Sequence, residues 1–599
     1  MATISTSGIS ALQVIKSEHL LRVINALNGV VSNDIIIGSS LNVTNGITGS
    51  LFGTSSYAIT ASYALNGGLI FPYTGSADIT GSVNLVGTFK QGSSTNTTTG
   101  QFSHAEGLST IASGSYSHAE GESTLASGDY SHAEGLITIA SGLGSHTEGE
   151  STLASGDYSH AEGVSTIASG DYSHVEGEDA LSSGRVSHAE GEGTIASGYG
   201  AHAEGYYTLA SGSYSHAEGT YITASGDYSH AEGVQTIASG DGSHAEGEAT
   251  QAQGPSSHAE GQFTLASGQK SHAEGHLTLT IGQYSHAEGH FTLASGNYSH
   301  AEGLYTTSSG LYSHAEGSGS RAFGTGSHAE GRSTISSGSF SHAEGSGSIS
   351  FGIGSHAEGQ FTLASGSFSH AEGLITTSSG QFSHTEGYLT MASGYASHAE
   401  GAATLASNLY SHAEGSQTIA SGITSHAEGQ NTVASGQSSH AEGSNNIASG
   451  FASHAEGNQT SASGQYSHAE GQFTLASGSY SHAEGQFTSA SGQFSHAEGL
   501  GTIASGSYQH VQGQYNLSSS AQSAFIVGNG TSTSNRSNLI FASGSQVQIT
   551  GSLLVSGSLV IPASTVATND LTTGSMYFNF STNFLYVYNG TAWRSSSLS

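Results

Sequence analysis

Cysteine is absent from this sequence, and proline and basic residues are scarce. The 599 residues include three prolines and only nine lysines and arginines. Without cysteine, the fold must be stable without disulfides. With so few basic residues there is no positive stripe to neutralise phosphates, so we expect no nucleic-acid binding. No run of 18 apolar residues occurs, and we expect no membrane insertion.

The composition is nevertheless not that of a disordered chain. Only 9% of residues are charged, and the chain contains 27 tyrosines and 21 phenylalanines. Residues Met1–Gly8 have neither the basic nor the apolar part of a secretory leader, so we expect no such export signal there. The formal net charge is −35 with neutral histidine, and the 33 histidines nearly equal this excess. Most of the negative charge can therefore be offset by residues that switch charge near neutrality.

One 14-residue unit fills the middle of the chain. Histidine recurs every 14 residues without an insertion from His104 to His510. Three histidines fall outside this register: His19, His276 and His290. The unit reads Ser-His-Ala-Glu-Gly-x-x-Thr-x-Ala-Ser-Gly-x-Tyr, as residues 467–480 show. We interpret residues 101–514 as thirty such repeats.

The unit favours two short strands over a helix. Each repeat contains two glycines, each of which costs a helix about 1 kcal/mol, and no coiled-coil seam is present. Ser-His-Ala-Glu and Thr-Ile-Ala-Ser are extended runs, and each is closed by a glycine suited to a turn. Two strands and two turns then make one coil of a narrow solenoid. Thirty coils stacked at about 4.8 Å give a rod of roughly 140 Å.

Such a coil encloses little volume. Small residues alternate along both strands, as Ala105, Gly107, Thr110 and Ala112 show. A sandwich this thin buries too little apolar surface to be stable alone. We therefore expect partners along its whole length, and a homotrimer is the simplest closed arrangement.

The unit resembles the head repeats of trimeric autotransporter adhesins, whose pattern is Ser-Val-Ala-Ile-Gly-x-x-Ala-x-Ala-x-Gly. The matching residues of the first unit are Ser103, Ala105, Gly107, Ala112 and Gly114. His104 and Glu106 stand in place of the Val and Ile. The Ser-His-Ala-Glu-Gly variant is similar to repeats of phage tail fibres. This resemblance implies an all-β fold, a left-handed parallel β-roll solenoid intertwined as a homotrimer.

The N-terminal residues differ from the repeats. Residues 10–28 predict one short helix with an apolar stripe, inside a segment 1–33 that we interpret as an attachment or trimerisation segment. A helix that caps the following residues is the alternative. Residues 34–100 predict a β-rich connector.

Residues 515–599 predict a C-terminal β-rich tip. Residues 575–594 indicate a hairpin with its turn near 581–583, and Asn589-Gly590 is a further turn signal. This part is similar to tip modules of phage tail fibres, which implies contact with a host receptor. Its aromatic residues form either the core of the hairpin or a receptor contact. The receptor-contact candidates are Tyr577, Tyr586, Tyr588 and Trp593.

One constellation that could carry chemistry is His-x-Glu, which recurs in the repeats. Residues two apart on a strand share a face, so the pairs can form a hydrogen-bonded structural ladder. Its representatives are His104, Glu106, His118, Glu120, His132, Glu134, His482 and Glu484. A metal site made of His104, Glu106, His118, Glu120 and their repeats is the alternative. Thirty stacked cations would repel one another strongly, and we expect neither a metal nor another cofactor.

Two properties of this ladder stay open in the sequence. The His–Glu face points either to the axis of a trimer or to the interior of the roll. The histidines are either charged, because glutamate partners raise their pKa, or neutral, because burial lowers it.

We expect no enzyme, because neighbouring Ser and His residues point to opposite faces of a strand and cannot act together as nucleophile and base. We interpret the chain as a structural and adhesive fibre, the rigid trimeric stem of a phage tail fibre. Its N-terminus would join the virion tail or baseplate, and its C-terminal tip would bind a host cell-surface receptor. A bacterial extracellular filament or surface adhesin is the alternative, and it would lie on the cell surface or outside the cell.

Overall fold

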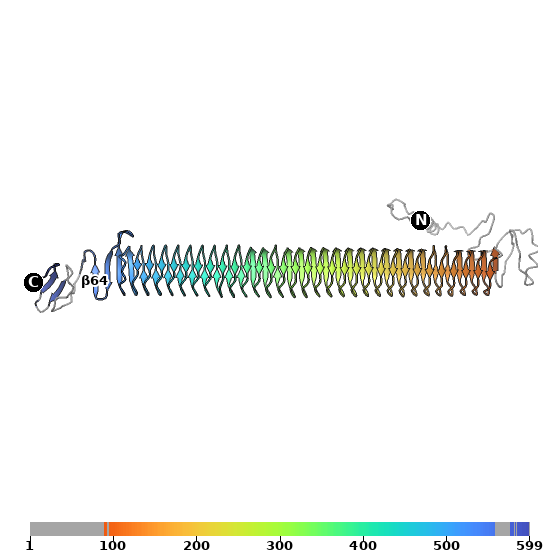
Figure 1. The fold of residues 1–599 in the computed structure, drawn as a ribbon, viewed down its shortest axis with the longest axis horizontal. Coiled ribbons are helices and arrows are strands. Elements are labelled where there is room, and N and C mark those ends of the chain that lie inside the picture. The colour runs from red at the N-terminus through yellow and green to blue at the C-terminus, as the bar shows by residue number, and fades with distance from the viewer. Residues whose placement is uncertain (1–88, 93–94, 557–575, 580–581, 583, 598–599) are drawn as a thin grey trace, which may run out of the picture. The chain divides into compact units, whose positions relative to one another are not determined.

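The computed structural model describes residues 89–92, 95–556, 576–579, 582 and 584–597 (Figure 1). The chain divides into two compact units. The smaller, Met1–Phe89 with Gln101–Ser103, lies almost wholly outside the described residues. The predicted helix at 10–28 therefore lies outside them, as do the attachment segment and most of the connector. Every described element of the larger unit is a β-strand.

Two strands and two turns form each coil of the larger unit (Figure 1). The first coil holds β3 (His104–Leu108) and β4 (Ile111–Ala112). The pair recurs every 14 residues as far as β59 (His496–Ala497) and β60 (Ile503–Ala504), and β61 (His510–Gln514) follows. Odd-numbered strands in this range begin at a repeat histidine. Most span five residues as far as β41 (His370–Leu374), whereas those from β43 (His384–Thr385) to β59 span two.

Successive coils stack as two parallel sheets with a constant 14-residue register. His104 lies opposite His118 in one sheet, and Ala112 lies opposite Ala126 in the other. The same register still holds where His496 meets His510. The predicted all-β parallel β-roll with 14-residue coils is therefore confirmed.

The interior of the roll holds small side chains. Ser117, Ala119, Thr124 and Ala126 are buried, and the equivalent positions are buried along the roll. The hydroxyl of Ser117 donates a 2.7 Å hydrogen bond to the carbonyl oxygen of Gly114, which satisfies a polar group in a space without water. Because alanine, serine and threonine fill the space between the sheets, the two sheets lie close together.

A glycine is required directly after the Ser-His-Ala-Glu run of each repeat. Gly121 has a φ of +109°, and a β-carbon at this residue would lie 2.0 Å from the carbonyl oxygen of Gly135 in the next coil. No other residue fits this backbone approach. This constraint explains why glycine always closes the Ser-His-Ala-Glu run.

The roll ends in an antiparallel cap. β62 (Phe525–Asn529) pairs in parallel with β61, so that Phe525 lies opposite His510. β63 (Asn538–Ser543) and β64 (Gln546–Ile549) then add in antiparallel order (Figure 1). The sheet of the roll thus continues beyond residue 514 and closes with strands of a different kind.

A separate three-stranded antiparallel sheet lies near the C-terminus of the chain. It consists of β65 (Met576–Asn579), β66 (Phe584–Tyr588) and β67 (Trp593–Ser597). The hairpin expected over 575–594 is present as β65 and β66. At the second turn, Asn589 Oδ1 accepts hydrogen bonds from the N–H groups of Thr591 and Ala592 at 3.1 and 2.9 Å. This turn adds the third strand, which the sequence interpretation did not contain.

Candidate functional site

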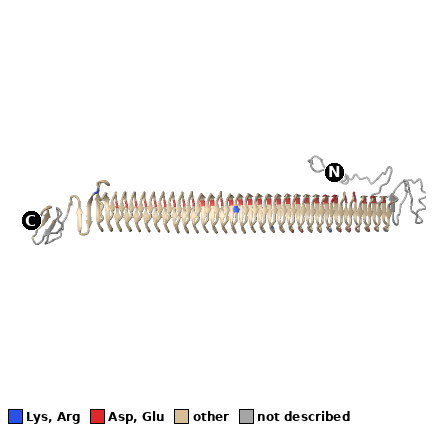
Figure 2. Cartoon of the chain, in the orientation of Figure 1, with Lys and Arg blue, Asp and Glu red and all other residues tan. Residues whose placement is uncertain are grey.

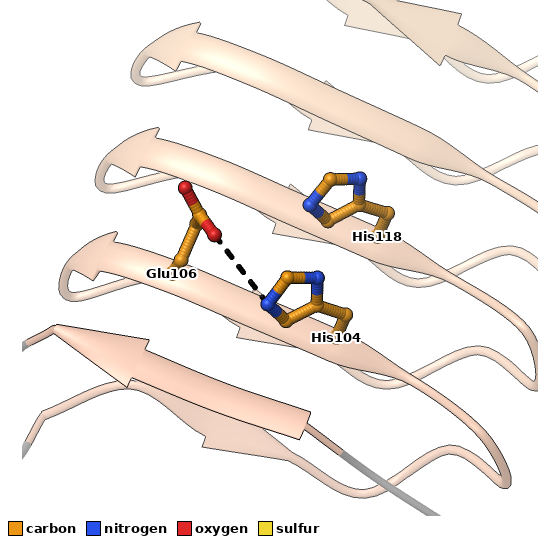
Figure 3. Close-up of side chains that lie close together, drawn as sticks. All are labelled: His104, Glu106 and His118. Carbon is orange, nitrogen blue, oxygen red and sulfur yellow. Dashed lines mark ion pairs between the residues drawn. The ribbon is translucent and has the colours of Figure 1, made fainter. Parts of the chain in front are cut away.

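The repeat histidines and glutamates lie on the outer face of the first sheet. In β5 (His118–Glu122), Ala119 points into the roll and is fully buried, while His118 and Glu120 are half-buried on the outside. Figure 3 shows the same arrangement for His104, Glu106 and His118. The hypothesis that this face points into the roll is therefore wrong, because alanine and serine already occupy the interior.

Most imidazoles of this face lie close to a carboxylate, in most pairs at a distance longer than a hydrogen bond. His118 Nε2 is 3.5 Å from Glu120 Oε2, and pairs of this kind range from 3.2 Å at His230 to 3.9 Å at His216. N–H···O hydrogen bonds in proteins span about 2.7–3.2 Å. One pair within the described residues, His454 and Glu442 at 3.2 Å, has hydrogen-bond geometry. In most coils the imidazole and carboxylate of the expected ladder are thus close neighbours without a hydrogen bond between them.

Towards the C-terminal end of the roll some carboxylates reach two coils. Glu470 lies 3.9 Å from His468 in its own coil and 3.6 Å from His482 in the next. Glu498 likewise lies 3.9 Å from His496 in its own coil and 3.7 Å from His510 in the next. A glutamate of this face is therefore positioned to bridge two successive imidazoles.

The imidazole rings form one stacked column. The rings of His104 and His118 have centroids 4.6 Å apart and planes 3° apart, and those of His118 and His132 are 4.7 Å apart. Rings at the far end, His482 and His496, are also 4.7 Å apart. The hydrogen bonds of the sheet set this spacing, so the chain presents nitrogen atoms at regular intervals along the roll.

Burial controls the protonation of this face. It lowers the pKa of His118 to about 4, and repulsion from His104 adds to the effect. Burial also raises the pKa of Glu120 to about 7, and Glu106 and Glu134 raise it further by repulsion. Burial thus favours the neutral form of His118, the second of the two alternatives, because desolvation outweighs the attraction of the carboxylate.

The glutamates form a continuous acidic edge. Figure 2 shows Asp and Glu side by side along one edge of the roll, with few Lys or Arg near them. At the C-terminal coils a groove of about 1030 Å³ runs along this edge. Its acidic lining is Glu442, Glu456, Glu470, Glu484 and Glu498. The carboxylates in this part are thus open to the surroundings on one side.

The second sheet carries an apolar column that sequence reasoning missed. The first residue of each even strand points outward, and it is Ile or Leu in most repeats. Ile111, Ile167 and Leu475 are 38–40% exposed. The sequence does contain this column, at the variable residue x of Thr-x-Ala-Ser. It is easily missed because one apolar residue per coil gives no alternation of apolar and polar residues within the strand.

Aromatic side chains form a further, interrupted column at the turns that precede many of the odd strands. Tyr116 and Tyr130 are stacked at 5.0 Å, and Tyr466 and Tyr480 at 4.8 Å. Tyr116 has a φ of +59°, a conformation that is uncommon for a bulky residue. Its ring is half exposed, so the turn keeps an aromatic residue where glycine would be less strained.

The predicted receptor-contact residues of the tip partly come together. Tyr588 lies opposite Trp593 in the sheet, and their rings are 5.4 Å apart. The hydroxyl groups of Tyr586 and Thr582 lie 3.4 Å apart. Tyr577 lies opposite Tyr586 in register, and its side chain is outside the described residues. The half-buried side chains of Tyr588 and Trp593 thus pack against each other on this sheet.

The described residues bring no nucleophile and base together in the repeat. Ser117 points into the roll and bonds to the Gly114 carbonyl, while His118 points outward. The regular roll and its repeats indicate a structural protein. The described part of the chain also contains no helix with the length and apolar character needed to cross a membrane.

Comparison with known proteins supports the same assignment. Seven segments match the family model of the YadA head domain repeat: 105–131, 189–215, 343–369, 413–439, 427–453, 455–481 and 483–508. These segments cover less than a third of the chain. No curated protein matches it. The chain thus contains an adhesin-like fibrous β-roll, which points to an extracellular or cell-surface protein.

Proposed function

We propose that the chain is the stem and tip of a homotrimeric adhesive fibre of a phage tail. The observation that carries this proposal is the combination of a regular thirty-coil roll with two outer columns, one of His and Glu and one of Ile and Leu. Neither column has a partner surface within one roll, and each repeats with the spacing of the coils.

The apolar column supports a second copy of the chain as the partner. Ile or Leu occupies the position of Ile111 in most coils along the roll. A surface that covers them in register must have the same rung spacing, and another copy of the roll has it. Burial of these half-exposed side chains between copies adds the apolar area that the thin interior lacks.

In the proposed trimer the His–Glu face lies towards the axis. Glu106 and Glu120 are only 10% and 12% exposed in one chain, and the other paired carboxylates, from 29% exposed at Glu134 to 50% at Glu218, would be covered by the neighbouring chains. The apolar columns then pack against neighbouring rolls. The N-terminal segment attaches to the virion tail or baseplate, and the sheet of β65–β67 contacts a host cell-surface receptor.

Electron micrographs and mass photometry of the purified full chain test this proposal. We expect rods of about 140 Å for the roll alone and three times the mass of one chain. A matched pair of variants locates the interface. Asp at Leu405, Ile419 and Val433 should reduce the trimer, whereas Asp at the turn residues Thr424, Ser438 and Ala452 should not. A stable monomeric rod would contradict the proposal.

A bacterial surface adhesin is the second candidate, and the match to the YadA head domain repeat favours it. Antibody against the roll, labelled with gold, separates the two. Label on the tails of virions supports the phage fibre, and label on the surface of the producing cell supports the adhesin.

A further inference from the structure

The His–Glu face contains buried polar atoms without a hydrogen-bond partner, repeated coil after coil. Histidine Nε2 atoms, such as those of His118 and His132, recur in this set along the roll, whereas its glutamate members are Glu106 Oε2 and Glu120 Oε2 in the first two coils. The Glu120 side chain is 12% exposed. A buried polar atom left unsatisfied is costly, and a cost repeated along the whole roll requires an explanation.

The separation of these atoms suits two ligands of one metal ion better than a hydrogen bond. His118 Nε2 and Glu120 Oε2 are 3.5 Å apart. Zinc binds nitrogen and oxygen ligands at about 2.0–2.2 Å, which places neighbouring tetrahedral ligands about 3.3–3.5 Å apart. An imidazole and a carboxylate are also ligand types that first-row transition metals accept.

Further ligands come from the adjacent coil. The ligand atoms of His118, Glu120 and His132 all lie within 4.8 Å of one another, and groups of this composition recur along the roll. Glu470, which lies near both His468 and His482, shows that one carboxylate can serve two coils. Two successive coils therefore supply two imidazole nitrogens and two carboxylate oxygens.

We propose that this face binds divalent transition-metal ions of the zinc type, one for every two coils, each held by two His Nε2 and two Glu Oε atoms of successive coils. The site is complete within one chain. It therefore does not depend on the proposed trimer or on the fibre function.

Charge favours this stoichiometry. Glu106 and Glu134 repel Glu120 in the same column, and few Lys or Arg lie near them. Two carboxylates and one divalent cation form a neutral group. Ions two rungs apart are separated by twice the 4.7 Å ring spacing, close to the Debye length of about 10 Å at 0.1 M salt. An ion in every coil would meet much stronger repulsion.

The column needs only a local adjustment to converge on an ion. Stacked rings present parallel nitrogen lone pairs, so two imidazoles must rotate towards each other to share a metal. The rings of His216 and His230 are already 41° apart, and those of His496 and His510 are 46° apart. Ring rotation is thus compatible with the coil spacing.

Metal content of the full chain tests the proposal directly. The chain is treated with a chelator, dialysed against excess Zn²⁺, and analysed for bound metal. We expect about fourteen ions per chain, half the number of His–Glu pairs between His104 and Glu498. Ca²⁺ and Mg²⁺, which prefer oxygen ligands, should not compete. Co²⁺ should give the visible absorption of tetrahedral coordination.

Two sets of five substitutions locate the ions. Glu→Gln at Glu302, Glu316, Glu330, Glu344 and Glu358 should remove two to three ions. Glu→Gln at the exposed Glu122, Glu150, Glu178, Glu192 and Glu248 makes the same change in charge away from the histidines and should remove none. Gln512 occupies the glutamate position of the last repeat, so the first set should still fold, as circular dichroism can verify.

The outcomes separate clearly. Fewer than two ions per chain, or equal losses in both sets of variants, means adventitious surface binding only and overturns the proposal. An octahedral Co²⁺ spectrum overturns the proposed ligand set. A monomeric chain that binds the expected number of ions would contradict the trimer and leave the metal site standing.

Discussion

Arg536 donates a 2.7 Å hydrogen bond from Nη1 to the carbonyl oxygen of Gly501, 35 residues earlier in the chain. The same nitrogen lies 3.2 Å from the carbonyl oxygen of Asn516. One guanidinium in the turn between β62 and β63 thus satisfies two carbonyl groups at the last coils of the roll. It joins the antiparallel cap to the repeat that the cap covers.

Arg536→Ala is expected to loosen the C-terminal end of the roll. Two part-buried carbonyl groups lose a charged donor, and each such loss costs about 1–3 kcal/mol. Hydrogen exchange should accelerate in β59–β61 and remain slow in the middle of the roll. Arg332→Ala, which removes an exposed arginine from a central coil, is the control. Unchanged exchange in β59–β61 would show that the cap holds without this arginine.

The thin interior should tolerate valine but not leucine. Ala301→Val is expected to be nearly neutral, because Val175 and Val511 occupy the equivalent position and are fully buried. Ala294→Leu overfills the second strand and should destabilise the roll by about 1–3 kcal/mol or more. Chemical denaturation of both variants measures the difference. Equal stability of the two would mean that the sheets can move apart.

The metal-free protein should lose stability in acid. Burial holds the pKa of His118 at about 4, below the ordinary value of 6.5, and the pKa of His482 is also lowered. A lowered histidine pKa means that folding excludes a proton, so stability falls as pH decreases from 6.5 towards 4. The raised pKa of Glu120 acts oppositely, since its contribution is full below pH 4.5 and is lost as pH rises to about 7.

The lowered pKa recurs at many histidines from His104 to His482. The histidines should therefore outweigh the glutamates and make the roll less stable as pH falls. With a chelator present, the melting temperature is expected to decline steadily from pH 7 to pH 4. Scanning calorimetry across this range checks it. A maximum near pH 5 would indicate that the histidines gain charge on folding.

Removal of the C-terminal sheet should separate attachment from the rod. Deletion of residues 557–599 leaves the roll and its cap, and under the proposed function it should abolish binding to host cells. Deletion of residues 285–312, two whole coils, is the matched control and should leave attachment intact. Cell-binding assays and micrographs of both variants measure attachment and rod length. Full binding by the first variant would place the recognition surface on the roll.

Much of the fold could be predicted because the repeat is strict. The constant 14-residue spacing gave the coil, and the glycines closing each run gave the turns, since a β-carbon at Gly121 meets the next coil's backbone. The outward direction of the His–Glu face follows from the small volume between the two sheets. Ala119 and Ser117 fit between sheets that lie this close together, and an imidazole does not.

The chemistry of the face could not be predicted in the same way. Whether His118 and Glu120 form a hydrogen bond depends on rotamers and on distances of a few tenths of an ångström. Their protonation depends on how burial competes with attraction, which is set by the stacked neighbours. The apolar column of Ile111 and Leu475 was missed because one outward residue per coil leaves no pattern within a two-residue strand.

The antiparallel cap has a consequence for how the rods behave in solution. A parallel stack with rungs 4.7 Å apart has the repeat of amyloid, and an open final rung is a template on which further strands can add. β62 continues the parallel stack, and β63 then pairs with β62 in antiparallel order, so a new coil cannot be added beyond β62 in the register of the roll. The reversal at β63 therefore removes the parallel template on which a further coil could add at this end of the roll.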